Sequence, residues 1–333
     1  MTAITQSRPK QKMDAKTRRR KIGHVLGRII FYLVCACLAY QLLYPVLYMS
    51  SMAIRDPADI NDPSIVWIPK HFTLDNFGDA LKSMNYWKSF GVSMTLSVVC
   101  GFFDVFSCAI AAYGFARFKF PGKNILFLIV VFTIVVPSQT LILPLYSRWR
   151  YASFGGLAQL LTGKESINLI GTLWPMIIPS MLAMGVRSGL YIFIYRQFFM
   201  GLPIALEDAA YMDGAGPYRT FFSIMLPNVK NAIITVFLFS FVWNWGEYYL
   251  SKQFLGSDNR SIMTALSMLR MDLSQVSALA GVQLGTNPEK IVTRMQAGCL
   301  LTAAPMLLVF ILPSASWPTP SSISASSNSL HKR

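Results

Sequence analysis

The sequence predicts an all-α, polytopic membrane protein with six transmembrane helices. Of its 333 residues, 53% are hydrophobic and only 14% are charged, whereas soluble domains usually carry about 25% charged residues. Six apolar runs reach or approach the length of about 20 residues that a helix needs to cross the hydrocarbon core. Basic residues also gather in alternate loops, a bias that membrane proteins use to set their orientation.

Residues 1–28 form a basic segment ahead of the first apolar run. Nine lysines and arginines lie in it: Arg8, Lys10, Lys12, Lys16, Arg18, Arg19, Arg20, Lys21 and Arg28. The positive-inside rule predicts that this tail stays in the cytoplasm, and its polar composition predicts disorder over residues 1–24. Because no aromatic residues are interleaved to stack on bases, the net charge of +15 does not indicate a nucleic-acid partner.

The six expected spans cover residues 29–54, 90–115, 125–145, 169–199, 229–250 and 295–312. The first run is too long for the core of a cleaved signal peptide, so we expect it to be retained. Pro137 and Pro144 interrupt the third run, and Pro175, Pro179 and Gly185 break the fourth. The transmembrane domain is therefore expected over residues 29–312.

The loops between these runs predict the topology. Arg117, Lys119 and Lys123 crowd the short second loop, whereas the first, third and fifth loops are longer and carry mixed charges. Both termini and the fourth loop are then expected on the cytoplasmic side. The polar segment 255–294 is too polar to span, and a helix is expected around residues 262–271.

The fourth loop, residues 202–227, has the layout of a docking element. Pro203 suits the first turn of a helix, where its missing N–H costs nothing. Gly214 and Gly216 are expected to end that helix because glycine accepts positive φ, and Pro217 begins a second helix. We call residues 202–227 the coupling loop and expect two short helices that project from the membrane.

The coupling loop also carries a sequence motif. Asp208, Ala209 and Ala210 are followed after three residues by Gly214, and after nine more by Ile224, Leu226 and Pro227. This resembles the E-A-A-x3-G-x9-I-x-L-P signature of ATP-binding-cassette (ABC) importer permeases, with Asp208 where the family usually has Glu. The amino-acid sequence from Glu207 to Pro227 is most similar to the carbohydrate-uptake branch, specifically the smaller maltose-type permease subunit.

This resemblance implies a type I importer permease fold in a bacterial inner membrane. The implied partners are a second permease subunit, two ATPase subunits, an extracytoplasmic solute-binding protein and membrane lipid. Nine residues would couple the spans to the ATPase: Glu207, Asp208, Ala209, Ala210, Asp213, Gly214, Ile224, Leu226 and Pro227. Ala209 and Ala210 are expected to let the helix approach a groove on the ATPase closely.

The chain itself is not expected to be an enzyme. It has no nucleotide-binding loop of the G-x4-G-K-[ST] type, and its three histidines do not accompany a Ser or Cys in a triad. The five cysteines fall in apolar runs and are expected to be packing residues, with no metal site. We therefore predict no catalytic residues, no metal and no cofactor.

Charged and aromatic residues within the runs are candidates for the substrate path. Asp104, Arg187 and Glu247 lie within or at the ends of spans, where a charge normally faces a partner or a water-filled cavity. A translocation role and an ion pair that only fixes packing both fit Asp104 and Arg187. Trp243, Asn244 and Trp245 suit a sugar by stacking and hydrogen bonding, although an aromatic belt at the membrane interface is the interpretation that their sequence favours.

Three questions stay open from the sequence. A permease for amino acids, peptides or ions, or a secondary transporter working without ATP, are the alternatives, and a neighbouring ATPase gene would discriminate against the latter. The solute and the homo- or heterodimeric pairing cannot be inferred. Residues 313–333 form a Ser/Pro-rich low-complexity tail, for which a shifted reading frame or cloning scar is one interpretation that resequencing tests.

Overall fold

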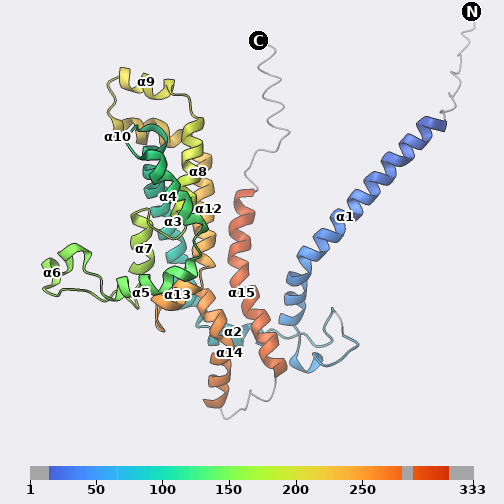
Figure 1. The fold of residues 1–333 in the computed structure, drawn as a ribbon. Coiled ribbons are helices and arrows are strands. Elements are labelled where there is room, and N and C mark those ends of the chain that lie inside the picture. Colours follow the sequence, from blue (N-terminus) through green and yellow to red (C-terminus); the bar gives the residue numbers. More distant parts are fainter. Residues whose placement is uncertain (1–14, 66, 280–287, 315–333) are drawn as a thin grey trace, which may run out of the picture.

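The computed structural model describes residues 15–65, 67–279 and 288–314, and this part of the chain is helical (Figure 1). No strand occurs among these residues, which contain only two isolated β-bridges, Arg55 with Phe72 and Ala152 with Ile167. The α-helices are α1 (Ala15–Ala53), α2 (Asp75–Ser83), α3 (Tyr86–Arg117), α4 (Lys123–Val135), α5 (Ile142–Arg150), α6 (Leu157–Thr162), α7 (Trp174–Met181), α8 (Ser188–Gly201), α9 (Ala205–Met212), α10 (Pro217–Thr220), α11 (Leu226–Asn228), α12 (Lys230–Trp245), α13 (Tyr249–Phe254), α14 (Ile262–Leu279) and α15 (Pro288–Ser314).

The long helix α3 lies at the centre of the bundle and packs against α7, α8 and α12. Its buried face is rich in small residues, including Ser97, Gly101, Ala109 and Ala112. Small side chains allow neighbouring helices to approach closely in a membrane, where van der Waals contact drives helix association. A Cβ atom added at Gly101 would lie 3.2 Å from the ring of Phe237 on α12, so the glycine permits this contact.

Among the described residues, three helices are long and apolar enough to cross a membrane by themselves: His24–Ala53, Tyr86–Arg117 and Glu289–Val309. Up to six spans result if each of three bent helix pairs is counted as one: Lys123–Val135 with Ser138–Arg150, Ser188–Gly201 with Ala205–Met212, and Pro217–Asn228 with Lys230–Trp245. These lengths and compositions agree with the predicted all-α, polytopic fold.

Prolines and strained turns break the third and fourth predicted spans. α4 ends at Val135, and the chain turns by 102° before Ser138–Arg150, because Pro137 has no N–H to donate and forces Val136 into an extended conformation. α7 and α8 are separated by a turn in which Ala183 has a φ of 54°. The interruption expected at Pro137 is therefore confirmed, and Gly185 lies in the break between α7 and α8. The breaks expected at Pro144, Pro175 and Pro179 are wrong: Pro144 and Pro175 lie in the first turns of α5 and α7, where a missing N–H costs little, and Pro179 lies inside α7.

Several helix boundaries differ from the sequence-based expectations. The run expected over residues 229–250 is divided into α12 and α13, and the run expected over 295–312 begins earlier, at Pro288 of α15. α1 begins at Ala15, so the prediction of disorder is wrong for residues 15–24, where helix-forming Lys and Arg residues continue the apolar helix. The helix expected around residues 262–271 extends to Leu279 as α14. The last helix includes Pro313 and Ser314, and the rest of the low-complexity tail lies outside the described residues.

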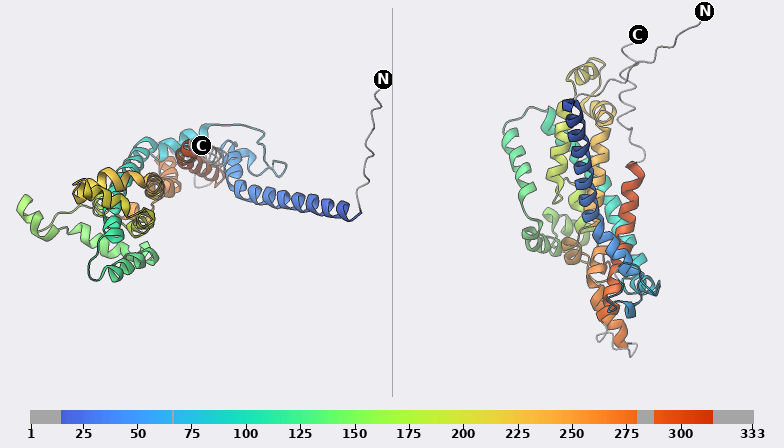
Figure 2. Two further views of the ribbon diagram at one scale, coloured as in Figure 1. Left: turned by 90° about the horizontal axis from the view of Figure 1, so that it is seen from above. Right: turned by 90° about the vertical axis from the view of Figure 1, so that its right-hand side faces the viewer.

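The helical bundle has two opposite ends, which different helices occupy (Figures 1 and 2). α9 and α10 lie at one end, together with the beginning of α1 and the end of α15. α2 and α14 lie at the opposite end, close to the loop that follows α1. The arrangement therefore has the start of α1, the coupling loop and the end of α15 at one end.

The contact of α4 with α8 depends on Gly189. A Cβ atom at this position would lie 2.3 Å from Thr133 Oγ1 and 2.7 Å from the carbonyl oxygen of Val130. We expect Gly189→Ala to displace α4 and to lower the free energy of unfolding by about 1–3 kcal/mol, as overpacking does. Thermal unfolding in detergent measures this change.

Gly91→Ala is the matched control, because it makes the same change within α3 at a site with no heavy atom within 4 Å. Removing a glycine from a helix interior should leave the melting temperature unchanged or raise it. Equal melting temperatures for the Gly189→Ala variant and the parent would contradict the close packing of α4 on α8.

Candidate functional site

The coupling loop forms a helical hairpin at one end of the bundle. α9 is bent by 76° from α8, and its first residue is Ala205, two residues after Pro203. Gly214 has a φ of 75° and makes the turn after α9, as expected. Gly216 does not: its φ and ψ of −72° and 169° are extended, so the positive φ predicted there is wrong. Pro217 begins α10, and Phe221–Met225 continues it as a π-helical turn into α11.

The predicted coupling residues divide between two faces of this hairpin. Asp208, Ala209, Asp213, Gly214 and Pro227 are exposed. Glu207, Ala210 and Leu226 are buried and Ile224 is half-buried. Large apolar side chains accompany the exposed set: Ile204, Met212 and Tyr218 are 64%, 88% and 83% exposed. An acidic residue beside uncovered apolar groups is typical of a surface that a partner protein covers.

Ala209 and Ala210 do not share one face. Ala209 is exposed, whereas Ala210 is buried within this chain. Adjacent residues of a helix point about 100° apart, so only Ala209 remains available to a groove on another protein. The small side chain of Ala210 instead lets α9 lie close to its own bundle.

The buried face of the hairpin is held by α3 and α8. The ring of Tyr113 on α3 lies 5.6 Å from that of Phe199 on α8 and 5.1 Å from that of Phe221. Arg117, at the end of α3, lies 3.5 Å from Glu207 through its Nε. In the sequence, Arg117 is recognisable only as a loop charge, because its contact with Glu207 joins residues 90 positions apart in the chain. Nothing local in the sequence indicates this contact.

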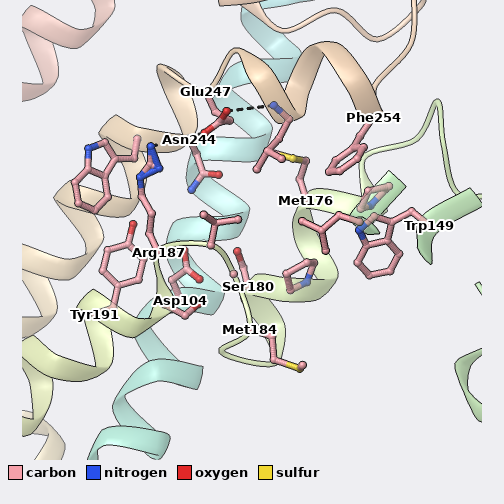
Figure 3. Close-up of a pocket in the computed structure, with 18 residues that line it drawn as sticks. Asp104, Trp149, Met176, Ser180, Met184, Arg187, Tyr191, Asn244, Glu247 and Phe254 are labelled. Carbon is pink, nitrogen blue, oxygen red and sulfur yellow. Dashed lines mark hydrogen bonds and ion pairs between the residues drawn. The ribbon is translucent and has the colours of Figure 1, made fainter. Parts of the chain in front are cut away.

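A cavity lies deeper in the bundle, between α3, α7, α8 and α12 (Figure 3). It brings together four of the five candidate path residues, which are Asp104, Arg187, Trp243 and Asn244. Glu247 also lines it. Trp149 and Phe254 stand on the opposite side from Asp104 and Arg187 in Figure 3. The cavity volume of about 80 Å³ accommodates a few water molecules.

Two separate sets of interacting side chains lie at this cavity. Ser240 Oγ donates to Asp104 Oδ2 at 2.6 Å, and Asn244 Nδ2 donates to Ser240 Oγ at 3.1 Å. Arg187 Nη2 lies 3.8 Å from Glu247 Oε2, and its guanidinium carbon lies 4.6 Å from the centre of the Trp243 ring. The carboxylate and the ring together stabilise a cation that would otherwise be costly within the membrane.

Three buried polar atoms at the cavity have no hydrogen-bond partner among the described residues. They are Asp104 Oδ1, Ser188 Oγ and Trp149 Nε1. Unpaired buried polar groups cost free energy, which water or a ligand in the cavity would recover. Trp149 was missed by the sequence analysis because it lies beyond the bend at Pro137, in α5, which only the fold brings back to the bundle.

Trp245 lies outside the cavity. It is 2% exposed and packs on Phe90 and Phe241, and its Nε1 donates to the carbonyl oxygen of Thr302 at 3.2 Å. This environment is a core position between α3, α12 and α15, and matches neither a path residue nor an interfacial belt. Residues two positions apart on an α-helix point about 200° apart, so Trp243 and Trp245 cannot act as one surface.

Among the described residues, no group of three or more His, Cys, Asp or Glu side chains gathers in a way that could hold a metal ion. The polar groups at the cavity are two carboxylates, a guanidinium, hydroxyls, two indoles and an amide. Such groups exchange hydrogen bonds with hydroxyl-rich molecules or water.

A comparison with known proteins identifies the family to which the chain belongs. Residues 106–317 match the family model described as "Binding-protein-dependent transport system inner membrane component". The matched region contains the coupling loop, α12 and all of the cavity-lining residues except Asp104, which lies two positions before it.

Curated relatives and a solved structure match more than half of the chain. The arabinooligosaccharides transport system permease protein AraQ of Halalkalibacterium halodurans is 25% identical, over 88% of this chain and 94% of the relative. The alpha-glucoside transport system permease protein AglG of Rhizobium meliloti is 31% identical, over 59% and 48% respectively. A crystal structure of a bacterial ABC transporter involved in import of the acidic polysaccharide alginate matches with a TM-score of 0.69 at 20% identity, over 89% of this chain and 97% of that chain.

Proposed function

The chain belongs to the binding-protein-dependent transport system inner membrane components, and from this premise we propose that it is the permease subunit of an ATP-driven sugar importer. The coupling loop carries the proposal. Its exposed face presents Asp208 beside the uncovered side chains of Ile204 and Met212. A chain without a nucleotide-binding loop needs such a surface to receive force from a separate ATPase.

The sugar is proposed from the relatives. The names of two curated relatives specify arabinooligosaccharide and alpha-glucoside transport. The cavity is compatible with a polyhydroxylated solute, since the unpartnered Asp104 Oδ1 can accept a hydrogen bond and the unpartnered Trp149 Nε1 can donate one.

The partners follow from the same premise. An ATPase and a solute-binding protein are common to binding-protein-dependent systems. We propose further that the chain pairs with a second permease subunit and that two ATPases bind the assembly. The coupling loop, the start of α1 and the end of α15 share one end of the molecule (Figure 1), and the basic residues before the first span favour placing this end in the cytoplasm of a bacterial cell.

We propose that Asp104, Arg187, Trp243 and Asn244 line the solute path, with Trp149 as an additional member. Their supporting observation is the shared cavity. The alternative is that Arg187 and Glu247 form an ion pair that only fixes the packing of α8 on α12. A variant pair described in the Discussion discriminates between the two roles.

Co-purification and uptake test the proposed function. The tagged chain, expressed with its neighbouring genes, should retain an ATPase subunit in detergent. Cells should accumulate one member of a panel of labelled arabino-oligosaccharides, alpha-glucosides and alginate oligosaccharides only when that ATPase hydrolyses ATP. Uptake that persists with a hydrolysis-deficient ATPase would contradict the proposal and favour a secondary transporter.

A further inference from the structure

The side chain of Arg117 lies where three segments of the chain meet. Its Nη2 donates to the carbonyl oxygens of Phe199 and Leu202 at 2.8 and 2.7 Å, and its Nε lies 3.5 Å from Glu207 Oε1. Phe199 belongs to the last turn of α8, Leu202 is the residue that caps α8, and Glu207 lies in the first turn of α9. One guanidinium thus contacts both sides of the 76° bend between α8 and α9.

These contacts suit the ends of both helices. The last carbonyls of a helix have no partner within it and carry partial negative charge, which a cation stabilises. The first turn of a helix favours an acidic residue for the opposite reason. Arg117 donates hydrogen bonds to carbonyl oxygens at the end of α8. The negative charge of Glu207 is favourable in the first turn of α9, and its carboxylate faces Arg117. The local charges therefore favour this bend over a continuous helix.

Burial makes the two side chains depend on each other. The side chains of Arg117 and Glu207 are only 9% and 10% exposed. Within the described part of the chain, Arg117 Nε and Glu207 Oε1 have no hydrogen-bond partner, so their ion pair is the interaction that compensates them. Removing either group would leave a buried charge without its counterion, which is strongly unfavourable.

The geometry also requires arginine. The planar guanidinium presents several N–H groups in fixed directions, so it contacts two carbonyl oxygens and a carboxylate at once. A lysine has the same charge but only a single nitrogen on a flexible chain. Below this contact, the rings of Tyr113, Phe199 and Phe221 pack against one another, so the end of α3 is attached to the segments on both sides of α9.

We propose that Arg117 is a positioning residue that locks α9 to the end of α3, so that a displacement of α9 moves α3 as part of one rigid unit. Without this lock, the chain between Leu202 and Ala205 would bend, and the displacement would be absorbed there. α3 contacts α7, α8 and α12, so its movement reaches the walls of the cavity that these three helices form. The inference rests on the proposed function, because a partner ATPase supplies the displacement.

Distance measurements between spin labels test the lock in the assembled transporter, reconstituted in liposomes with its co-purifying ATPase. One label is placed at Met212, at the end of α9, and one at Trp87, at the start of α3; both positions are largely exposed. The exposed Cys35 and Cys37 are replaced by serine. In the parent, ATP with vanadate should leave the distance between the labels unchanged, because α9 and α3 move together.

In Arg117→Met, the same addition should shift or broaden the distance distribution. Uptake should fall by about tenfold or more, within the usual range of coupling effects, while the ATPase still co-purifies and hydrolyses ATP. Arg117→Lys and Glu207→Gln should behave in the same way, and they carry the test if Arg117→Met fails to fold. Lys119→Gln, which removes an exposed cation two positions further on, should match the parent.

The lock is overturned if Arg117→Lys and Glu207→Gln keep both the parental distance distribution and the parental uptake. The behaviour of Asp208→Lys separates this failure from a failure of the proposed function. If that exposed substitution blocks uptake while the Arg117 and Glu207 variants behave as the parent, only the lock is wrong. If Asp208→Lys transports normally, docking through the coupling loop is wrong.

Discussion

The Asp208→Lys variant is expected to lose solute uptake by about a hundredfold, as a like-charge contact costing several kcal/mol at an interface would cause. Asp208 is exposed in the first turn of α9. There, a negative charge is favoured by the helix dipole, and a positive charge is not. The substitution also reverses the charge that α9 presents to the ATPase. Uptake of the sugar identified by the panel, measured beside ATP hydrolysis by the same membranes, gives the result.

Two controls isolate the position and the charge. Asp208→Glu restores the residue usual in the resembling family and should keep uptake within about twofold, because the charge stays in the first turn. Asp258→Lys makes the same change of charge at an exposed loop position outside the coupling loop and should leave uptake unchanged. Because Asp208 packs against nothing in the core, the spans should assemble in all three variants. Normal uptake by Asp208→Lys would refute docking through this surface.

Arg187→Met should lower the free energy of unfolding by about 3 kcal/mol, the lower end of the cost of breaking a buried ion pair. The lower end applies because the Arg187 side chain is 35% exposed, whereas that of Glu247 is 9% exposed. The substitution leaves the Glu247 carboxylate without its cation and removes the contact of the guanidinium with Trp243. Thermal or denaturant unfolding of the purified protein in detergent measures the change.

The double variant Arg187→Met with Glu247→Leu separates the two roles of the pair. Removing both charges should restore most of the stability, because no uncompensated charge remains buried. If the pair lines the solute path, uptake should stay at least about tenfold below that of the parent, since the ligand contacts are gone. Recovery of uptake together with stability would instead assign the pair to packing alone.

The sequence by itself determined the class of the protein. Long apolar runs, few charges and basic loops at alternate positions suffice for a helical membrane protein, because each span satisfies its backbone hydrogen bonds within itself. The coupling loop was also recognisable, since Pro217 and Gly214 act on the backbone locally and the motif has fixed spacing. Such signals survive without knowledge of the neighbours.

The tertiary structure alone decided which side chains act together. Glu207 and Asp208 are adjacent acidic residues of similar chemistry, yet one pairs with Arg117 inside the bundle and the other is exposed. Trp243 lines the cavity while Trp245 is buried in the core, and Trp149 returns to the cavity only because the chain bends at Pro137. Helix rotation and long-range packing set these differences, and a membrane span that is apolar on most faces carries little periodic signal to reveal its orientation.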